Sequence, residues 1–554
     1  MLLVPVFSAL QLLVPHLFGE AIDEVSNFGE EGPPDGWIVE TVLLLIAVTL
    51  VASTVRFGSR LLQIGLSRLV EEELRNDLFR HLQRAPQRYF DQARIGDLVS
   101  RSTQDVELMR FMAGPTLFFG LSAALLIPGT LFMLFHVSPS VGVTVIALFG
   151  LIALGMRIAF PRIAELSRVV QDRQADISAK AQEDFSGIRV LHAFAKEEAE
   201  VESFGGLAQA CYDAHVDMAR SRALLHATFV AASLAAPLAV IVAGVVENLS
   251  LGQLFSAFVY MQLLAWPLLV VGWVVQTWHR ARAAADRIDE VFVVEPEADN
   301  AQGEFADAAP SIEARHLTFR YEGAATAALR DVSFNVQPGQ VLGLVGPVGS
   351  GKTTLVHLLA RIYTPLPGQL FVGGDDVLDL DLGELRSELA VAPQDPFLFS
   401  DSLKSNVTFG APDTVAAADI ENAIAHSALA SDLDAFPDGL EQVVGERGVT
   451  LSGGQKQRAS LARALLAERR VLVLDDTLSA VDHDTERRIL ETLRQRERSQ
   501  TTIVIAHRLE AVRHADHIVV LEGGDVLDQG RHDDLLTRDG WYARTWHQQQ
   551  EKRQ

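Results

Sequence analysis

The residues whose types and spacing point most clearly to chemistry form the run G-x-x-x-x-G-K-T, from Gly346 to Thr353. The apolar run Val341–Val345 before it is typical of a buried strand, and Lys352 to Ala360 is typical of a helix. Glycines let backbone N–H groups turn towards phosphate oxygens, the lysine adds a positive charge, and the threonine offers a hydroxyl to Mg²⁺. The sequence therefore predicts a phosphate-binding loop, with Gly346, Gly349, Ser350, Gly351, Lys352, Thr353 and Thr354 as its binding residues.

A second run places acidic residues at the end of an apolar strand. The segment Val471–Leu474 is followed directly by Asp475 and Asp476. A sheet holds a carboxylate rigidly at such a position, and Mg²⁺ takes oxygen ligands from protein, water and phosphate. We therefore predict that Asp475 and Thr353 hold Mg²⁺ beside the phosphates of a nucleotide.

Between these runs lies Leu451-Ser452-Gly453-Gly454-Gln455, which opens a helical segment rich in Ala, Leu and Arg. Together with the phosphate loop, this element resembles the signature of the ATP-binding cassette (ABC) ATPases. The resemblance implies ATP and Mg²⁺ as cofactors. It also implies that Ser452, Gly453, Gly454 and Gln455 bind phosphate, because two glycines before a helix make a second phosphate-binding N-terminus.

Further matches follow in the order that the family has them. The resemblance implies that Tyr321 stacks on adenine, that Gln394 contacts Mg²⁺ and the attacking water, and that His507 is the switch histidine, so Gln394 and His507 join the catalytic residues. Two loops match as well, namely Gly445–Gly448 before the signature and the D-loop Ser479–Asp482, from which Asp482 is expected at the nucleotide.

Composition and charge narrow the class of protein. The chain has 554 residues, of which 49% are hydrophobic, and the apolar residues are concentrated in the first half. The single cysteine, Cys211, excludes an intrachain disulfide framework. A formal net charge of −24 argues against nucleic acid as a partner. A solvated acidic surface and a salt-rich habitat both remain as sources of the acidic bias.

Six apolar stretches before residue 280 are each close to the ~20 residues that a helix needs to cross a bilayer. The connection after the second and the one after the fourth are rich in arginine, whereas Asp23–Gly36, His136–Pro139 and Glu247–Ser250 contain no Lys or Arg. By the positive-inside rule, both termini and the ATPase half are cytoplasmic. We expect a multi-pass protein of the bacterial inner (plasma) membrane with spans at Met1–Ile22, Trp37–Phe57, Pro115–Phe135, Ser140–Phe160, Leu224–Val246 and Leu251–Val275.

The N-terminus lacks a positively charged region and a small-residue cleavage site, so we do not expect a secretory signal peptide. Among the ABC proteins that this chain resembles, exporters usually begin with a basic amphipathic elbow helix, and such a helix is missing here. Loss of the elbow and a start codon placed too late both remain open.

Two polar segments between the spans resemble the coupling helices of ABC exporters, namely Tyr89–Arg101 and Asp184–Phe194. Their implied role is to pass ATPase motion into the membrane helices. The resemblance as a whole implies an α-helical membrane domain of six transmembrane helices, like the type IV ABC exporters, joined to an α/β P-loop ABC ATPase domain. We place the membrane domain at residues 1–285, a linker at 286–310 and the ATPase domain at 311–554.

One residue complicates the mechanism. In this family each ATP lies between the phosphate loop of one chain and the signature of the other, so a dimer is implied. Active members carry a glutamate after the Mg²⁺-linked aspartate, where this chain has Asp476 as its candidate catalytic base. The shorter side chain makes it a poor general base, as in the Mdl-type multidrug-resistance-like exporters that this run resembles. We therefore expect a heterodimer with a partner that carries the glutamate, although the retained His507 and a slow homodimer leave the question open.

The resemblance implies an ATP-driven exporter subunit that acts with the lipid bilayer. Few charged residues lie within the spans, which favours hydrophobic or amphipathic cargo, drug-like or lipid-like, over an ion. Aromatic residues that could line a cargo pocket are Phe118, Phe119, Phe132, Phe229, Tyr260, Trp266 and Trp273. In membrane spans, however, aromatic residues more often pack between helices or anchor them at the interface. The alternatives are a homodimeric lipid or drug exporter with slow ATPase, and a regulator or channel of the same architecture without active transport.

Overall fold

The computed structural model describes residues 3–28, 34, 36–297, 309–412, 414–434, 436–445, 448–477, 486–489 and 500–551, apart from the side chains of residues 229, 232 and 233. The chain forms two compact units. The first comprises Met1–Arg80 and Gly96–Phe292, and the second comprises His81–Ile95 and Val293–Gln554. A short segment from the first half of the sequence, His81–Ile95, therefore belongs to the second unit.

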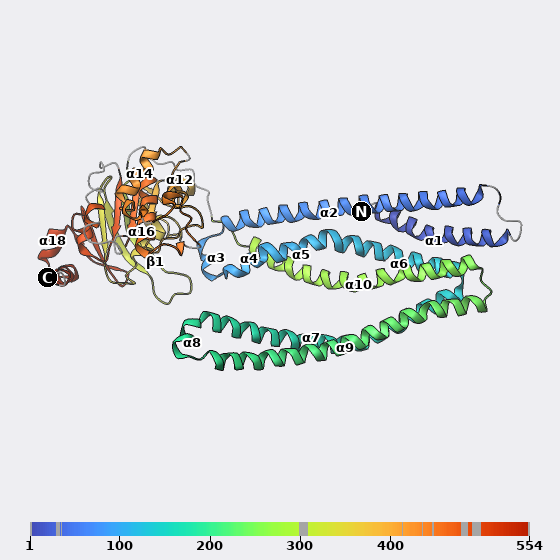
Figure 1. Ribbon diagram of the computed structural model, residues 1–554. Helices are drawn as coiled ribbons and strands as arrows, with labels where there is room; N and C mark the ends of the chain where they lie inside the picture. Colours follow the sequence, from blue (N-terminus) through green and yellow to red (C-terminus); the bar gives the residue numbers. More distant parts are fainter. Residues whose placement is uncertain are drawn as a thin grey trace. The chain divides into compact units, whose positions relative to one another are not determined.

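The first unit consists of long helices (Figure 1). Several of them contain apolar runs that continue into charged sequence, so the helices are longer than a membrane span requires. The elements are α1 (Leu3–Asn27), α2 (Trp37–Gln83), α4 (Ile95–Ser100), the π-helical η2 (Arg101–Asp105), α5 (Val106–Phe111), the π-helical η3 (Met112–Thr116), α6 (Leu117–Val137), α7 (Pro139–Ser186), α8 (Ile188–Phe194), α9 (Glu197–Val246) and α10 (Leu251–Phe292).

Two sets of helices pack closely in this unit. The helices α1, α6 and α10 contact one another, and α7 runs beside α9, to which it is joined by α8 (Figure 1). Polar groups tie α10 to α1, since Tyr260 Oη donates to the Leu12 carbonyl at 2.8 Å and Ser256 Oγ donates to the Pro15 carbonyl at 2.9 Å. Satisfied hydrogen bonds of this kind are expected where polar groups lie among apolar helices.

The structure has five helical segments that are long and apolar enough to cross a membrane among the described residues, namely Leu3–Asn27, Trp37–Gln83, Ile95–Val137, Pro139–Ser186 and Leu251–Phe292. They correspond to five of the six predicted spans. The remaining one, Leu224–Val246, lies on α9, where the apolar helix segment Leu234–Val246 is shorter than a span. The number of six transmembrane helices therefore stays a prediction.

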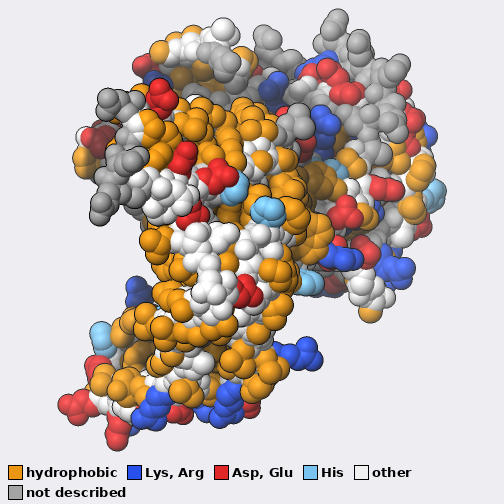
Figure 2. Space-filling view, turned by 90° about the vertical axis from the view of Figure 1, so that its right-hand side faces the viewer, with side chains coloured by type: hydrophobic (Ala, Val, Ile, Leu, Met, Phe, Trp, Pro, Cys, Tyr) orange, Lys and Arg blue, Asp and Glu red, His pale blue; other side chains and the backbone are white. Residues whose placement is uncertain are grey.

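The long helices expose much of their apolar surface. On α2, side chains such as Leu43, Leu44 and Leu50 are exposed. The space-filling view shows broad areas of hydrophobic side chains on the face turned to the viewer (Figure 2). Apolar surface of this extent is stable when lipid or another chain covers it.

The second unit is built on two sheets. One has the strand order β10-β9-β3-β8-β7-β6, in which all neighbours are parallel except β10 and β9. The other is antiparallel, with the order β2-β1-β4-β5. The strands are β1 (Ile312–Phe319), β2 (Leu329–Val336), β3 (Val341–Val345), β4 (Leu370–Val372), β5 (Asp375–Asp376), β6 (Leu389–Ala392), β7 (Val471–Asp475), β8 (Thr501–Ile505), β9 (His517–Glu522) and β10 (Asp525–Gly530).

Helices cover these sheets and form a separate helical lobe, in which α13, α14 and α16 share a core around Leu403, Ile424 and Ala462. The central strands are fully buried, as a parallel sheet with both faces covered requires. The helices of this unit are α3 (Gln87–Gln92), α11 (Lys352–Leu359), α12 (Leu382–Ser387), α13 (Leu403–Thr408), α14 (Ala417–His426), α15 (Ala430–Leu433), η4 (Gly439–Glu441), α16 (Gly453–Leu466), η6 (Leu509–Val512), α18 (His532–Thr537) and α19 (Trp541–Glu551).

Candidate functional site

The strand order brings four of the predicted motifs to one edge of the parallel sheet. Strand β3 leads into the phosphate loop, its neighbour β8 leads to His507, the next strand β7 ends at Asp475, and β6 leads to Gln394. The carboxyl ends of parallel strands lie at the same edge of a sheet, where open α/β folds bind their ligands. The fold therefore collects residues from distant parts of the sequence, between Gly346 and His507, along one line.

The phosphate loop has the backbone that favours glycine at three positions. Gly346, Gly349 and Gly351 have φ of 151°, 78° and 101°. A Cβ atom on Gly346 would lie 2.0 Å from the Leu521 carbonyl oxygen, and one on Gly351 would lie 2.6 Å from the Ala328 carbonyl oxygen. Side chains are therefore excluded where the backbone must turn its N–H groups towards a ligand.

Lys352 is the first residue of α11 and is only 7% exposed. Its Nζ atom donates to the carbonyl oxygens of Gly346 at 3.0 Å and Pro347 at 2.8 Å. Burial lowers the pKa of Lys352, and the carboxylates of Asp475 and Asp476 act in the opposite direction. The ammonium group is thus held over the loop, where phosphate oxygens would replace the carbonyl groups as its partners.

Thr353 and Asp475 form the second part of the site. Thr353 Oγ1 donates to Asp475 Oδ2 at 2.9 Å, and Asp475 is 3% exposed. Burial raises the pKa of Asp475, which the hydrogen bond from Thr353 partly offsets. A hydroxyl and a buried carboxylate at this spacing fit the oxygen-ligand preference of Mg²⁺, and the charge of the ion would favour the ionised carboxylate.

Asp476 follows at the end of β7 with a constrained backbone. Its φ is 46°, which is uncommon for a residue with a Cβ atom. Its N–H group donates to the Ile505 carbonyl at 3.0 Å. Strand β8 thus holds the backbone of Asp476 by a hydrogen bond that opposes a shift of the main chain, and the side chain itself is short.

Tyr321 lies beside the phosphate loop. Its hydroxyl is 3.1 Å from Thr354 Oγ1, so the two form a hydrogen bond. Its ring makes edge contacts with Phe319 and Tyr363, at centroid distances of 5.1 and 5.0 Å. The predicted adenine-stacking ring is therefore positioned by an aromatic cluster.

Gln394 and His507 lie at the same edge of the sheet but do not hydrogen-bond to the loop through their side chains in the part of the chain that the structure describes. Gln394 is exposed, and its carbonyl oxygen accepts from Gln457 Nε2 at 3.4 Å. The carbonyl oxygen of His507 accepts from Gln549 Nε2 at 2.9 Å. Their predicted roles at the Mg²⁺ ion and the γ-phosphate stay predictions.

The signature element lies at the start of α16. Ser452 caps this helix, because its Oγ atom accepts from Gln455 N while Gln455 Oε1 accepts from Ser452 N at 2.9 Å. Ser452 and Gly453 are exposed. Among the described residues, no hydrogen bond joins Ser452 to Lys352. The capping box preorganises a helix N-terminus that faces solvent in this chain.

Some predicted residues lie outside the part that the structure describes. They are Asp482 with the whole D-loop Ser479–Asp482, and Glu446 and Arg447 of the loop before the signature. In the opposite direction, sequence reasoning missed Tyr363 as a neighbour of Tyr321. Its position after α11 carries no motif that would have indicated the contact.

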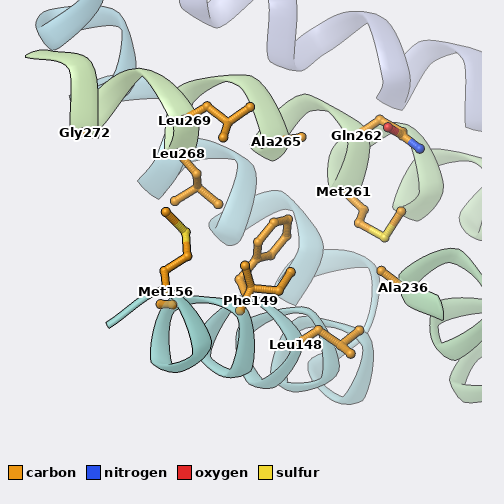
Figure 3. Close-up of a pocket in the computed structure, with 12 residues that line it drawn as sticks. Leu148, Phe149, Met156, Ala236, Met261, Gln262, Ala265, Leu268, Leu269 and Gly272 are labelled. Carbon is orange, nitrogen blue, oxygen red and sulfur yellow. The ribbon is translucent and has the colours of Figure 1, made fainter. Parts of the chain in front are cut away.

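The first unit contains two neighbouring apolar cavities. One, of about 270 Å³, lies between α7 and α10, and Figure 3 shows Phe149, Met156 and Leu268 pointing towards it. The other, of about 770 Å³, shares Leu148 and Met156 with the first and has Arg222 and His226 in its wall. These residues form a predominantly apolar lining, as hydrophobic ligands require.

Several of the aromatic residues predicted to line a pocket pack between helices, although Trp273 also lines a further cavity beside α10. Phe119 packs against Trp266 and Trp273, with centroid distances of 6.5 and 6.0 Å, and so joins α6 to α10. Tyr260 is buried in the helix core. The side chain of Phe229 lies outside the described residues. Of the predicted aromatic side chains that the structure does describe, none lines either of the two cavities.

Comparisons with known proteins agree with this geometry. Residues 2–268 match the ABC transporter transmembrane region, and residues 329–479 match the ABC transporter family. The chain is 32% identical to "Probable multidrug resistance ABC transporter ATP-binding/permease protein YheI" of Bacillus subtilis (strain 168), over 98% of this chain and 93% of the relative. It is 32% identical to "Multidrug resistance-like ATP-binding protein MdlA" of Escherichia coli (strain K12), over 99% and 93%.

Two further similarities cover almost the whole chain. The "ATP-dependent lipid A-core flippase" of Pseudomonas fluorescens (strain Pf0-1) is 33% identical over 97% of this chain and 91% of the relative. The solved "Structure of a bacterial Atm1-family ABC exporter with ATP bound" has a TM-score of 0.78 and 26% identity, covering 99% of this chain and 97% of that one.

These similarities confirm the predicted fold class, a helical membrane domain joined to an ABC ATPase domain. They also confirm ATP hydrolysis coupled to transport, with ATP and Mg²⁺ as cofactors. The protein is embedded in the membrane, and its ATPase domain is cytoplasmic, as in this family. The chain belongs to the ABC transporters, as an exporter that carries its membrane helices and its ATPase in one polypeptide.

Proposed function

We propose that this chain is one half of an exporter that moves hydrophobic or amphipathic compounds, drug-like or lipid-like, out of the cytoplasm or the inner leaflet of a bacterial inner membrane. The apolar cavities beside α7 and α10 support such cargo. The names of the relatives, which mention multidrug resistance and lipid A, point to the same class. In this proposal residues 1–285 form the membrane domain, 286–310 the linker and 311–554 the ATPase domain, with both termini cytoplasmic.

The ATP-binding half-site follows from the contacts at the phosphate loop. Lys352 binds the β- and γ-phosphates, while Thr353 and Asp475, already hydrogen-bonded to each other, hold Mg²⁺. When bound, Mg²⁺ neutralises charge that develops on the phosphate oxygens. Tyr321 stacks on the base, and Gln394 and His507 contact the attacking water and the γ-phosphate.

The second half-site is the exposed N-terminus of α16. The signature residues Ser452–Gln455 lie at the capped start of this helix. In the described part of the chain, Ser452 makes no hydrogen bond to the phosphate loop. A helix N-terminus of this kind suits an ATP molecule held by another chain. We infer that a partner subunit supplies the phosphate loop for this signature, and that the partner's signature covers the ATP held by Lys352.

Asp476 supports one kind of dimer over the other. Its backbone is held against Ile505, so its carboxylate stays about one methylene further from the water than a glutamate would. This anchored, shortened acid beside Lys352 and the Thr353–Asp475 pair is the observation that carries the proposal. We propose a heterodimer in which this chain's site turns over slowly, while the partner's glutamate drives hydrolysis beside Ser452.

A transport assay tests the exporter function. The complex is reconstituted in sealed vesicles with a fluorescent hydrophobic dye or a labelled lipid, and ATP with Mg²⁺ is added outside. ATP-dependent movement of the cargo is expected, together with its loss in a complex that carries Asp475→Asn in this chain and the matching change in the partner. ATP hydrolysis without cargo movement for either class would instead indicate a regulator or a channel.

The composition of the complex tests the heterodimer. The tagged chain is purified from its native membranes, and the intact complex is weighed by native mass spectrometry. We expect the mass of one copy of this chain, 60.5 kDa, plus the mass of one different subunit. That subunit should carry a glutamate after its Mg²⁺-linked aspartate. A mass of two identical chains would establish the homodimer and overturn the heterodimer proposal.

A further inference from the structure

The second unit contains a contact between the first coupling segment and the neighbourhood of the nucleotide. Tyr363 Oη donates to Asp91 Oδ2 at 2.6 Å, although the two residues are 272 positions apart. Asp91 lies on α3, within the segment His81–Ile95 that belongs to this unit. A short hydrogen bond from a phenol to a carboxylate is among the stronger kinds.

The ring of Tyr363 continues the contact towards the nucleotide. It lies at 88° to the ring of Tyr321, with a centroid distance of 5.0 Å, and the Tyr321 hydroxyl reaches Thr354 in the phosphate loop. Edge-on aromatic pairs have a preferred geometry, so a base that shifts the Tyr321 ring would also disturb its contact with Tyr363. Asp91, Tyr363, Tyr321 and Thr354 thus form one unbroken chain of contacts.

The backbone of Tyr363 is also tied to the helix that begins at Lys352. Ile362 N donates to the His357 carbonyl at 2.8 Å, and Tyr363 N donates to the same oxygen at 3.4 Å. These bonds close the end of α11, and the Tyr363 ring lies 5.8 Å from the His357 ring. Tyr363 is therefore fixed to the phosphate-loop helix at its backbone and to α3 at its hydroxyl.

The linker closes the same region from another side. Glu297 N donates to the Arg84 carbonyl at 2.9 Å, and Arg386 Nη2 donates to the Glu297 carboxylate at 3.0 Å. A cleft of about 690 Å³ is bordered by α3, by the linker residues 295–297 and by Tyr321. A base that stacks on Tyr321 would therefore lie beside this cleft and its α3 wall.

We propose that Tyr363 is a positioning residue that links the nucleotide to the first coupling segment. When the adenine of ATP stacks on the Tyr321 ring, Tyr363 passes the effect on to Asp91. This inference rests on the proposed function, in which Tyr321 stacks on adenine. Tyr363 does not touch the reacting atoms. Its hydroxyl holds α3 in the position that the stacked base favours.

Hydrogen exchange of the full-length chain in lipid nanodiscs tests the proposal, with the peptide over residues 87–92 as the readout. Saturating ATP with Mg²⁺ is expected to slow exchange there about threefold or more, because local opening becomes rarer. Tyr363→Phe keeps the ring and removes only the hydroxyl, so ATP affinity should stay within about twofold while the protection of α3 is lost. Tyr212→Phe, at an exposed tyrosine on α9, is the matched control.

Two further experiments distinguish this relay, the transmission from Tyr321 through Tyr363 to Asp91, from a general loss of stability. Asp91→Ala should lose the protection of α3 as Tyr363→Phe does, whereas Asp91→Asn should retain it because its amide oxygen still accepts. The double variant Tyr363→Phe/Asp91→Ala should lose no more protection than either single variant. Tripolyphosphate with Mg²⁺, which has no base, should protect the phosphate loop but not α3.

Full protection of α3 in Tyr363→Phe, or equal protection by tripolyphosphate and ATP, would overturn the relay. Absence of ATP binding to the unmodified chain would instead contradict the proposed function, since the phosphate-loop peptide reports binding independently of α3. The two failures are therefore distinguishable.

Discussion

The two coupling segments of this chain belong to different units and differ in their contacts within them. The first, around α3, is joined to the ATPase unit by the Tyr363–Asp91 hydrogen bond and by the contact of Glu297 with Arg84. The second, around α8, exposes large apolar side chains, with Phe185 at 76% and Phe194 at 72%. Apolar surface that a protein holds in a rigid helical turn is stable when another surface covers it.

In the proposed dimer this difference would correspond to a division of labour. The second unit contains its own contact with α3, whereas we expect a partner subunit to cover the apolar side chains of α8. The nucleotide sites show the same division, because Lys352 lies in a buried half-site and Ser452 lies on an exposed helix end. In the proposed dimer, each half of the chain would thus have one part that this chain completes and one part that a partner completes.

The largest effect is expected at α8. Phe194→Ser removes an exposed aromatic side chain, so the stability of the chain should change little, but transport by the assembled complex should fall by roughly tenfold or more, as for a central interface anchor. Transport per mole of complex in vesicles is the measurement. Leu527→Ser, at a side chain on β10 that is 49% exposed, is the control. Normal transport by Phe194→Ser would remove α8 from the proposed interface.

A smaller effect is expected where the linker meets the ATPase unit. Glu297→Gln replaces the carboxylate that accepts from Arg386 and should lower the free energy of unfolding by about 0.5–1 kcal/mol. Thermal unfolding and hydrogen exchange of residues 81–95 measure it. Glu441→Gln removes an exposed pair with Lys404 and should change neither. Equal effects of the two variants would mean that the linker contact adds nothing specific.

The smallest effect is expected beneath α8. Lys180, which lies beyond the predicted span Ser140–Phe160, donates to Glu200 and to Asp184 and so ties α7 to α9. Hydrogen bonds to these carboxylates raise the pKa of Lys180. The stability that the charged Lys180 adds is therefore complete below the ordinary lysine pKa of about 10.4, and it is lost only as the pH rises through the raised pKa of the folded chain. Lys180→Met should speed exchange of residues 188–194 by about twofold, equally at pH 6 and pH 8. A pH-dependent effect in that range would contradict the assignment.

Much of the site could be predicted because its chemistry lies in short contiguous runs. The loop from Gly346 to Thr353 and the strand before Asp475 each carry their own pattern, and the strand order then brings them together. The fold class followed from the same motifs and from the apolar stretches. The structure adds the constrained backbone of Asp476, which no pattern of side chains indicates.

Other features could not be predicted, for physical reasons. The Tyr363–Asp91 contact joins residues 272 positions apart, and no pattern in the sequence pairs the two positions. The aromatic residues of the spans had two predicted roles, and in the structure Phe119, Trp266 and Trp273 pack α6 against α10, so their role towards cargo stays a prediction. Aromatic side chains serve both purposes, so residue type alone does not separate them.

The proposed heterodimer with a slow site at Asp476 is best tested by the ATPase rate of this chain purified alone in lipid, beside the same chain with Asp476→Glu. We expect very slow turnover by the unmodified chain. Turnover should rise when a partner that carries the glutamate is co-expressed, and a dimer of Asp476→Glu chains should be faster by up to about a hundredfold. A brisk rate for the unmodified chain, little changed by Asp476→Glu, would contradict the slow site and establish a self-sufficient homodimer.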